Sequence, residues 1–209
     1  MRLAYLYIII LLGSHSMVNG QTYLWDSWWR GEVTLEDGTL EKGMVNYDYE
    51  SRTLIVRKEK SEKTYVAGNV YSFWVERIYE AKTVTKSKET YFSIYEENEY
   101  GYRMPSFYRA LILGEVSVLL KGELLYQYSF DDPQFYIKNV PYLLFRDGRL
   151  ERAKTWKKRL ITQIEGDQRD LKRYIKKERL LLHDPVDLAK FIQFHNRNLS
   201  TLKNETRTL

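Results

Sequence analysis

The chain has 209 residues and a formal net charge of +5, and 15% of its residues are aromatic, including 18 tyrosines. This length is enough for one sizeable domain, or for a domain with an appendage. The chain contains no cysteine, which excludes disulfides, thiolate zinc sites, iron–sulfur clusters and cysteine catalysis.

The excess of positive charge is local. Between Leu150 and Leu182 there are eleven Lys or Arg and five Asp or Glu, which gives a local balance of +6. The remainder of the chain is therefore close to neutral. A patch that attracts anionic surfaces is accordingly expected only in this C-terminal part.

The first twenty residues predict a signal peptide. Arg2 is a short positive region, and Leu3–Leu12 is an apolar run of about ten residues, short of the ~20 that span a bilayer. Val18-Asn-Gly20 offers tolerated residues before a cleavage at Gln21. An uncleaved membrane anchor is the alternative. No cysteine follows to carry a lipid, so we expect an exported protein, periplasmic or secreted.

Residues 31–43 predict the first hairpin of the fold. Asp37-Gly38 lies between two alternating runs, the strongest short-range signal for a two-residue loop, because glycine adopts the positive φ of a type I′ turn. With this loop, Leu35 faces Leu40 across the hairpin.

The next apolar residues do not keep the same parity. Leu40 and Val45 fall on opposite faces of a regular strand, and a strand cannot change its buried face without an extra residue. We therefore predict a bulge at Gly43.

Further strands follow up to Leu150. Strands are predicted over Thr53–Lys58, Val70–Ile78 and Phe135–Phe145, with a solvent-facing or edge strand at Lys82–Glu89. The wholly polar segment Glu59–Lys63 predicts a loop, and Lys121-Gly122 predicts a hairpin turn. Roughly eight to ten short strands recur at a spacing of about 8–12 residues, which is typical of an antiparallel barrel, sandwich or meander.

The period changes to that of helices after Leu150. Asp167 and Asp184 are the expected N-caps of two helices, and Pro185 suits the first helical position. The sequence therefore predicts an α+β protein. An antiparallel β domain covers residues 21–150, and a helical segment over 151–209 packs on it.

Several of these segments together resemble a group of secreted proteins of Bacteroidetes. The likeness lies in the glycine-bounded hairpin of residues 31–43, in Asn69–Phe73, and in the helical end with Lys172–Lys177 and Phe194–Asn196. It implies export and this fold type. The group carries no established activity, so the resemblance assigns no functional residue.

Motifs for catalysis, metals and cofactors are weak. His183 and His195 match no metal-binding spacing, and His195 lies on an apolar helical stripe, which favours a packed histidine. The sequence contains no G-x-S-x-G and no glycine-rich phosphate loop, and we expect no cofactor. A glycan hydrolase would need paired carboxylates; the loop candidates are Glu96, Glu97, Glu99, Asp131 and Asp132.

Two groups of residues are candidates for binding. Aromatic rings can stack on a glycan or another ligand; the first candidates are Trp25, Trp28, Trp29 and Trp74. A basic helical surface can contact anionic membranes; its members are Lys157, Lys158, Lys172, Arg173, Lys176 and Lys177. Export argues against nucleic acid as the partner.

We therefore expect a non-enzymatic protein with a structural or binding role in the cell envelope. Its expected partner is an envelope protein or a glycan. An envelope hydrolase acting through the loop carboxylates and a binder of anionic membrane surfaces are the alternatives.

Overall fold

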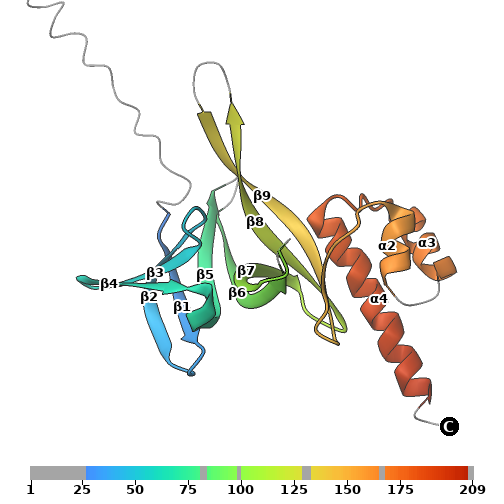
Figure 1. Cartoon of the computed structure of the whole chain (residues 1–209). Coiled ribbons are helices and arrows are strands. Elements are labelled where there is room, and N and C mark those ends of the chain that lie inside the picture. Colours follow the sequence, from blue (N-terminus) through green and yellow to red (C-terminus); the bar gives the residue numbers. More distant parts are fainter. Residues whose placement is uncertain (1–26, 81–83, 98–99, 129–132, 165–167, 207–209) are drawn as a thin grey trace, which may run out of the picture.

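The structure is a computed structural model that describes residues 27–80, 84–97, 100–128, 133–164 and 168–206. The predicted signal peptide and Trp25 lie outside the described residues. Within them, the α+β class is confirmed: a ten-stranded antiparallel sheet is followed by three α-helices (Figure 1). The strands are β1 (Trp29–Leu35), β2 (Leu40–Asp48), β3 (Thr53–Lys58), β4 (Ser61–Val66), β5 (Val70–Glu80), β6 (Val84–Glu97), β7 (Arg103–Ile112), β8 (Val116–Tyr128), β9 (Pro133–Phe145) and β10 (Leu150–Arg152).

The strands form one sheet in the order β10-β9-β8-β7-β6-β5-β1-β2-β3-β4. Neighbours in this order are neighbours in sequence except at β1, which lies between β2 and β5. The chain therefore makes two meanders, and a short 3-10 helix, η1 (Ala67–Asn69), links β4 to β5. This arrangement places the first hairpin inside the sheet, with β5 on one side of it and β3 on the other.

The first hairpin differs from the prediction by one residue. Leu35 N–H donates to Thr39 O (2.9 Å) and Gly38 N–H donates to Leu35 O (3.0 Å), with φ +84° at Gly38. The loop therefore has three residues, which is the other common hairpin that a glycine of positive φ permits. As a result Thr34, and not Leu35, pairs with Leu40.

The predicted bulge at Gly43 is wrong for the same reason. With this register Leu40 lies on the outer face and is 55% exposed, so no change of face is needed before Val45. Gly43 instead pairs with Gly31 in a regular ladder. A Cβ at Gly43 would lie 2.4 Å from Arg57 O, and one at Gly31 would lie 2.3 Å from Trp74 O. The two glycines thus permit a close approach of the neighbouring strands.

The prediction of an edge strand at Lys82–Glu89 agrees with the pairing of its described part, because residues 84–89 of β6 pair with β5 alone and β7 joins β6 only from Tyr91 onward. Two other predictions along the sheet fail. The polar segment 59–63, predicted as a loop, supplies the start of β4. Lys121-Gly122 is not a turn, because β8 runs through it without interruption and pairs with β9 along its length. In both failed predictions, polar or glycine residues occupy strand positions that tertiary pairing stabilises.

The helices α2 (Lys157–Gln163), α3 (Gln168–Lys177) and α4 (Pro185–Thr206) pack against one end of the sheet, next to β8 and β9 (Figure 1). Asp184 caps α4 as predicted, since its Oδ1 accepts the N–H groups of Val186 (2.8 Å) and Asp187 (3.1 Å). Asn196 of α4 exchanges two hydrogen bonds with the backbone of Val116 on β8. These contacts fix α4 on the sheet.

Two apolar cores result. The helical core joins the three helices to β8 and β9 through residues such as Val118, Leu143 and Phe191. The N-terminal core lies inside the curl of β1–β3 and β5–β7, and its members include Val33 and Phe73. Among the described residues, no helix combines the length and the apolar character needed to cross a bilayer.

Candidate ligand-binding cavity

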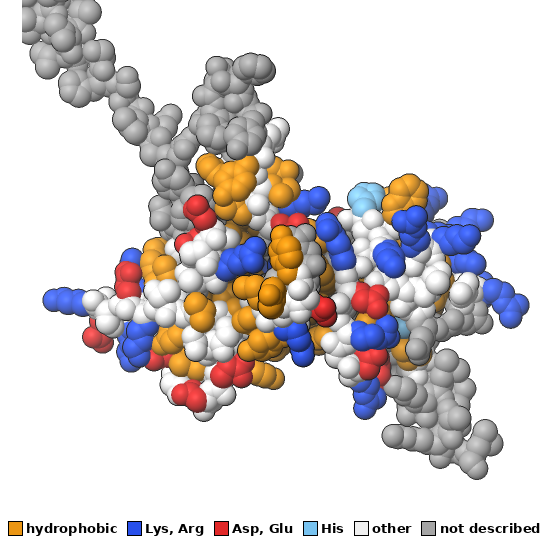
Figure 2. All heavy atoms as spheres, in the orientation of Figure 1, with side chains coloured by type: hydrophobic (Ala, Val, Ile, Leu, Met, Phe, Trp, Pro, Cys, Tyr) orange, Lys and Arg blue, Asp and Glu red, His pale blue; other side chains and the backbone are white. Residues whose placement is uncertain are grey.

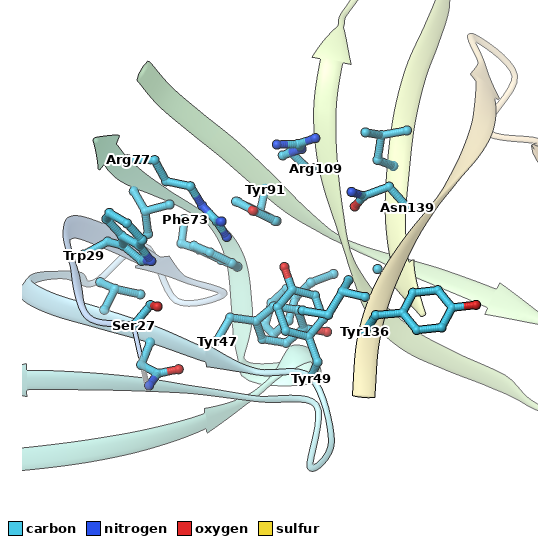
Figure 3. A pocket seen from close by; sticks show the side chains of 17 residues that line it. Ser27, Trp29, Tyr47, Tyr49, Phe73, Arg77, Tyr91, Arg109, Tyr136 and Asn139 are labelled. Carbon is cyan, nitrogen blue, oxygen red and sulfur yellow. The ribbon is translucent and has the colours of Figure 1, made fainter. Parts of the chain in front are cut away.

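A cavity of about 520 Å³ opens beside the N-terminal core, between β1–β2, β5–β7 and the β8–β9 hairpin (Figure 3). This volume is in the range of sites that hold small organic ligands. Aromatic rings supply much of its lining: Trp29, Tyr47, Tyr49, Phe73, Tyr91, Phe107 and Tyr136. The other lining residues are Ser27, Val45, Asn46, Val75, Arg77, Arg109, Leu120, Gly122, Ile137 and Asn139.

The rings form a continuous wall. Tyr49 lies 4.3 Å from Tyr47 between ring centroids, and Tyr47 meets Phe107 edge-on at 5.3 Å. Phe107 meets Phe73 edge-on at 5.1 Å, and Phe73 stacks on Tyr91 at 4.5 Å. These are the separations that aromatic pairs favour. The wall is therefore a packed unit that holds its shape without a ligand.

Tyr49 also touches the far side of the cavity. A Cβ at Gly122 of β8 would lie 2.4 Å from Tyr49 Cε1, so the ring occupies space that only a glycine leaves open. In a flat sheet β2 and β8 would be five strand spacings apart, about 24 Å. The contact therefore requires a strongly curled sheet, like an incomplete barrel, with the β8–β9 hairpin brought over its concave side.

The β8–β9 hairpin lies over the concave side of the sheet because most of its length is not paired with β7. The pairing of β7 with β8 covers only Arg109–Ile112 against Val118–Leu120, whereas β8 pairs with β9 from Val116 to Tyr128. Beyond Leu120 the hairpin is thus free of β7, and Figure 1 shows it projecting from the body of the sheet. Gly122 and Tyr136 of the hairpin line the cavity.

A buried ion-pair cluster lies at the other end of the aromatic wall. Glu89 is 6% exposed, and its carboxylate pairs with Arg109 and with Arg77, whose Nε lies 2.8 Å from Oε2. The hydroxyl of Tyr91 donates to the same oxygen at 2.9 Å. A buried carboxylate needs such partners to offset its lost hydration. We call Arg77, Glu89 and Arg109 the arginine–glutamate cluster.

The phenols of the wall are neutral donors. Burial raises the pKa of Tyr91 well above its ordinary value, with the nearby Tyr49 as the next cause. Burial likewise raises the pKa of Tyr47. Loss of hydration disfavours the phenolate, so neither ring supplies an anionic nucleophile or base at neutral pH.

A second, smaller cavity of about 370 Å³ lies beside the first, on the other side of Tyr47 and Tyr49. Ser106 and Lys121 line it. Glu96 accepts hydrogen bonds from Ser106 Oγ (2.7 Å), Tyr108 Oη (2.6 Å) and Lys121 Nζ. This network ties β6, β7 and β8 together at the point where the hairpin leaves β7.

The network controls the charge of Glu96. Burial raises the pKa of Glu96, but the hydrogen bonds from Lys121, Tyr108 and Ser106 and the charge of Lys121 outweigh it, so the pKa lies below the ordinary 4.5. Lys121 is thereby paired with a carboxylate. Ser106 donates to the same carboxylate and not to Lys121, so the hydrogen bond between nucleophile and base of a serine–lysine pair is not formed.

The predicted tryptophans lie at different places. Trp29 lines the cavity. Trp28 lies outside that lining, with the guanidinium of Arg57 3.7 Å from its ring centroid. Trp74 alternates with the inward-facing Phe73 and Val75, and the ammonium of Lys88 lies 4.2 Å from its ring. The structure therefore brings Trp29 alone of the described three into the cavity.

The six predicted basic residues are all exposed on α2 and α3. Figure 2 shows blue side chains gathered over the helical part of the molecule. They lie on a different part of the protein from the cavity, which is formed by strands and their connecting segments. Within the described part of the chain, the six form two ion pairs, Arg173 with Asp170 on α3 and Lys177 with Glu178.

The predicted carboxylates and histidines form no shared site among the described residues. Glu96 and Glu97 belong to β6, not to a loop, while Glu99, Asp131 and Asp132 lie outside the described residues. His195 is buried at 1% exposure, as its place on the apolar stripe predicts, and His183 is exposed. In the described part of the chain, no group of three or more potential metal ligands occurs.

The arginine–glutamate cluster was missed from the sequence. Its three members lie at inward-facing positions of three strands. Each is two residues from a buried aromatic or apolar residue of its own strand: Arg77 from Val75, Glu89 from Tyr91, and Arg109 from Phe107. A charged residue at a position that continues the alternation of buried residues can indicate a buried ion pair. The sequence alone does not show which face of these strands is buried, because their register is set by pairing with residues distant in sequence.

Comparisons with known proteins found no match to this chain among family models, curated proteins or solved structures. The site is therefore interpreted from its geometry.

Glu96 provides a test of this geometry. Its pKa is lower in the folded than in the unfolded state, so ionised Glu96 stabilises the fold above about pH 4.5, and the effect is lost as the pH falls through the folded pKa. We expect Glu96→Gln to reduce the free energy of unfolding by about 2 kcal/mol at pH 7. The loss should shrink as the pH falls through the folded pKa of Glu96. Urea unfolding at pH 7 and at an acidic pH measures both.

Glu97→Gln is the matched control. Glu97 is the next residue on β6, is exposed, and forms no ion pair with another described residue. Its replacement should change the free energy of unfolding by less than about 0.5 kcal/mol at either pH. Equal effects of the two substitutions at pH 7 would contradict the placement of Glu96.

Proposed function

We propose that this chain is an exported, non-enzymatic binding protein of the cell envelope and that its aromatic cavity holds a small ligand with an apolar body. The observation that carries the proposal is the preformed wall of packed rings around a cavity of about 520 Å³. Aromatic and apolar side chains with a few polar groups are the usual lining of ligand sites. The export part rests on the sequence of residues 1–20.

The polar groups at the cavity favour binding over catalysis. Among the described residues that line the cavity there is no histidine, cysteine, lysine or acid, so these residues supply none of the usual pairs of a nucleophile and a base. Glu89, the nearest buried carboxylate, is held by two arginines and a tyrosine. Tyr91 and Tyr47 are neutral phenols. These groups orient a ligand by hydrogen bonds and charge.

The test uses the uncharged fluorescent probe N-phenyl-1-naphthylamine, which brightens in apolar sites. We expect saturable binding to the protein lacking residues 1–20, and a Kd about tenfold weaker for Trp29→Ala, because the substitution removes one aromatic ring from the cavity lining. Fluorescence titration measures both values.

Trp28→Ala is the matched control, since Trp28 is the adjacent residue but stacks on Arg57 outside the cavity lining. Its Kd should equal that of the parent protein. Absence of saturable binding, or equal losses in the two variants, would contradict the proposed cavity function.

A second candidate function is contact with an anionic membrane surface. The helices α2 (KKRLITQ) and α3 (QRDLKRYIKK) together contain eight basic residues and one acid, Asp170. All nine side chains are exposed. A basic surface of this kind attracts anionic lipid headgroups, with each Lys or Arg contributing about 1 kcal/mol near the surface.

This second function predicts co-sedimentation with phosphatidylglycerol-containing vesicles but not with phosphatidylcholine vesicles. Replacing Lys172 and Lys176 by Gln should weaken binding about tenfold or more, and raising the salt from about 0.1 M to about 0.5 M should largely abolish it. The paired control replaces Lys58 and Lys60, two exposed lysines at the end of β3 and in the turn that follows. Vesicle binding that is unchanged by salt and by the replacement of Lys172 and Lys176 would rule out this candidate.

A further inference from the structure

The smaller cavity lies in the fork between β7 and β8. These two strands pair only over residues 109–112 of β7 and residues 118–120 of β8, and then they diverge. The cavity of about 370 Å³ lies between the diverging parts, since residues 105–107 of β7 and residues 121–124 of β8 both line it. The described strands place nothing between β7 and β8 in the sheet. We call this space the fork.

The direction of the β8 backbone groups follows from the neighbouring strand. Ala153 N–H donates to Pro141 O (2.9 Å), so the carbonyl of Pro141 on β9 points away from β8. In an antiparallel ladder the N–H and C=O of one residue point to the same side, and opposed residues alternate between bonded and non-bonded pairs. Pro141 is opposite Leu120. The N–H and C=O of Leu120 therefore point toward β7.

The same alternation continues along β8, because its register with β9 has no shift. Gly122, Leu124 and Tyr126 therefore direct their N–H and C=O groups toward the fork, and all three line the smaller cavity. Glu123 and Leu125 direct theirs to β9. Among the described strands, none pairs with this edge of β8 beyond its short contact with β7. The cavity thus has a row of backbone donors and acceptors along one side.

Prolines occupy the neighbouring strand edges but not this one. Pro105 on β7 has the same parity as Arg109, which pairs with β8, so the side of β7 that faces the fork lacks one N–H donor. Pro133 and Pro141 occupy positions of β9 that face away from β8. Proline blunts an edge because it cannot donate to a further strand. The sequence of β8 contains no proline, so its edge keeps every donor.

The side chains around the fork select for apolar residues. Gly122 lies against the ring of Tyr49, and Leu124 and Tyr126 share its face because side chains alternate along a strand. Residues of an added strand directly opposite these three would point to the same face. Tyr47 and Tyr49 line the cavity on that face. Apolar side chains at every second position of the added strand would therefore be buried there.

We propose that the fork binds an extended segment of a partner protein, which adds as a strand along residues 122–126 of β8 and carries apolar side chains at alternate positions. In this mode of recognition, main-chain hydrogen bonds supply affinity and pockets for alternate side chains supply specificity. The inference goes beyond the proposed function of the larger cavity and does not depend on it.

Amide hydrogen exchange, measured by nuclear magnetic resonance, tests the edge in the protein alone. The amides of Glu123 and Leu125 should be protected by β9, whereas those of Gly122, Leu124 and Tyr126 should exchange at least about tenfold faster. Equal protection of both sets would mean that the edge is already covered, by this chain itself or, if protection rises with protein concentration, by a second copy. Either result would overturn the proposal.

The binding probe is a short capped peptide of alternating threonine and valine with a lysine at each end. Its addition should slow exchange at Gly122, Leu124 and Tyr126 by at least about tenfold, with saturable shifts of the same amide resonances. N-methylation of the valines should abolish binding, because these residues lie opposite the fork-facing groups of β8. N-methylation of the threonines, the matched control, should preserve it. A probe that does not bind, or equal binding of the two methylated peptides, would overturn the proposal.

A substitution in the protein tests the same hydrogen bonds from the other side. Leu124→Pro removes an N–H that faces the fork and no bond to β9, so it should weaken peptide binding at least about tenfold. Leu124→Thr is the matched control, since it keeps the N–H, and its Kd should stay within about threefold of the parent value. Retained amide protection at Glu123 and Leu125 shows that the pairing with β9 is intact. Equal binding by the two variants contradicts strand addition at this edge, and the methylated peptides test it in the unaltered protein.

Discussion

The ring of Tyr49 lies against Gly122, and this contact joins two strands that a flat sheet would hold about 24 Å apart. The sheet must curl for the two residues to meet. Curling brings the β8–β9 hairpin over the concave side of β1, β2 and β5–β7, and the space left between them is the cavity. Gly122 matters because any side chain there would displace the ring, and with it the closing side of the cavity.

From this contact a line of packed rings runs to the arginine–glutamate cluster. Tyr49, Tyr47, Phe107, Phe73 and Tyr91 follow one another at ring separations between 4.3 and 5.3 Å. The hydroxyl of Tyr91 then meets Glu89. Burying that carboxylate would be costly without its arginines. The apolar wall and the charged end are therefore parts of one packed unit, which is why we interpret them as one site.

Local signals in the sequence predicted local features of the fold. The bounds of β3 and the cap of α4 at Asp184 are correct, because alternation and capping act over a few residues. The first hairpin was predicted one residue out of register, since Asp-Gly suits both two- and three-residue loops. That single residue turned Leu40 outward and removed the need for a bulge at Gly43.

The residues of the cavity are brought together by strand pairing between segments distant in sequence, which no local sequence pattern encodes. Gly122 was interpreted as a turn because a glycine in a strand resembles one, whereas its role is set by Tyr49 from a distant strand. The sequence predicts a ligand contact at Trp29 because aromatic rings can stack on ligands. It does not indicate Arg77 or Arg109, because charged residues on strands are usually solvated and only the strand register places these two beside a buried carboxylate.

The contact between Tyr49 and Gly122 can be measured directly by nuclear magnetic resonance. The account predicts nuclear Overhauser effects between the ring protons of Tyr49 and the α-protons of Gly122, with a ring-current shift of those α-protons that disappears in Tyr49→Leu. Ordinary glycine shifts and no Overhauser effect in the folded protein would contradict the curled sheet and the cavity that it encloses.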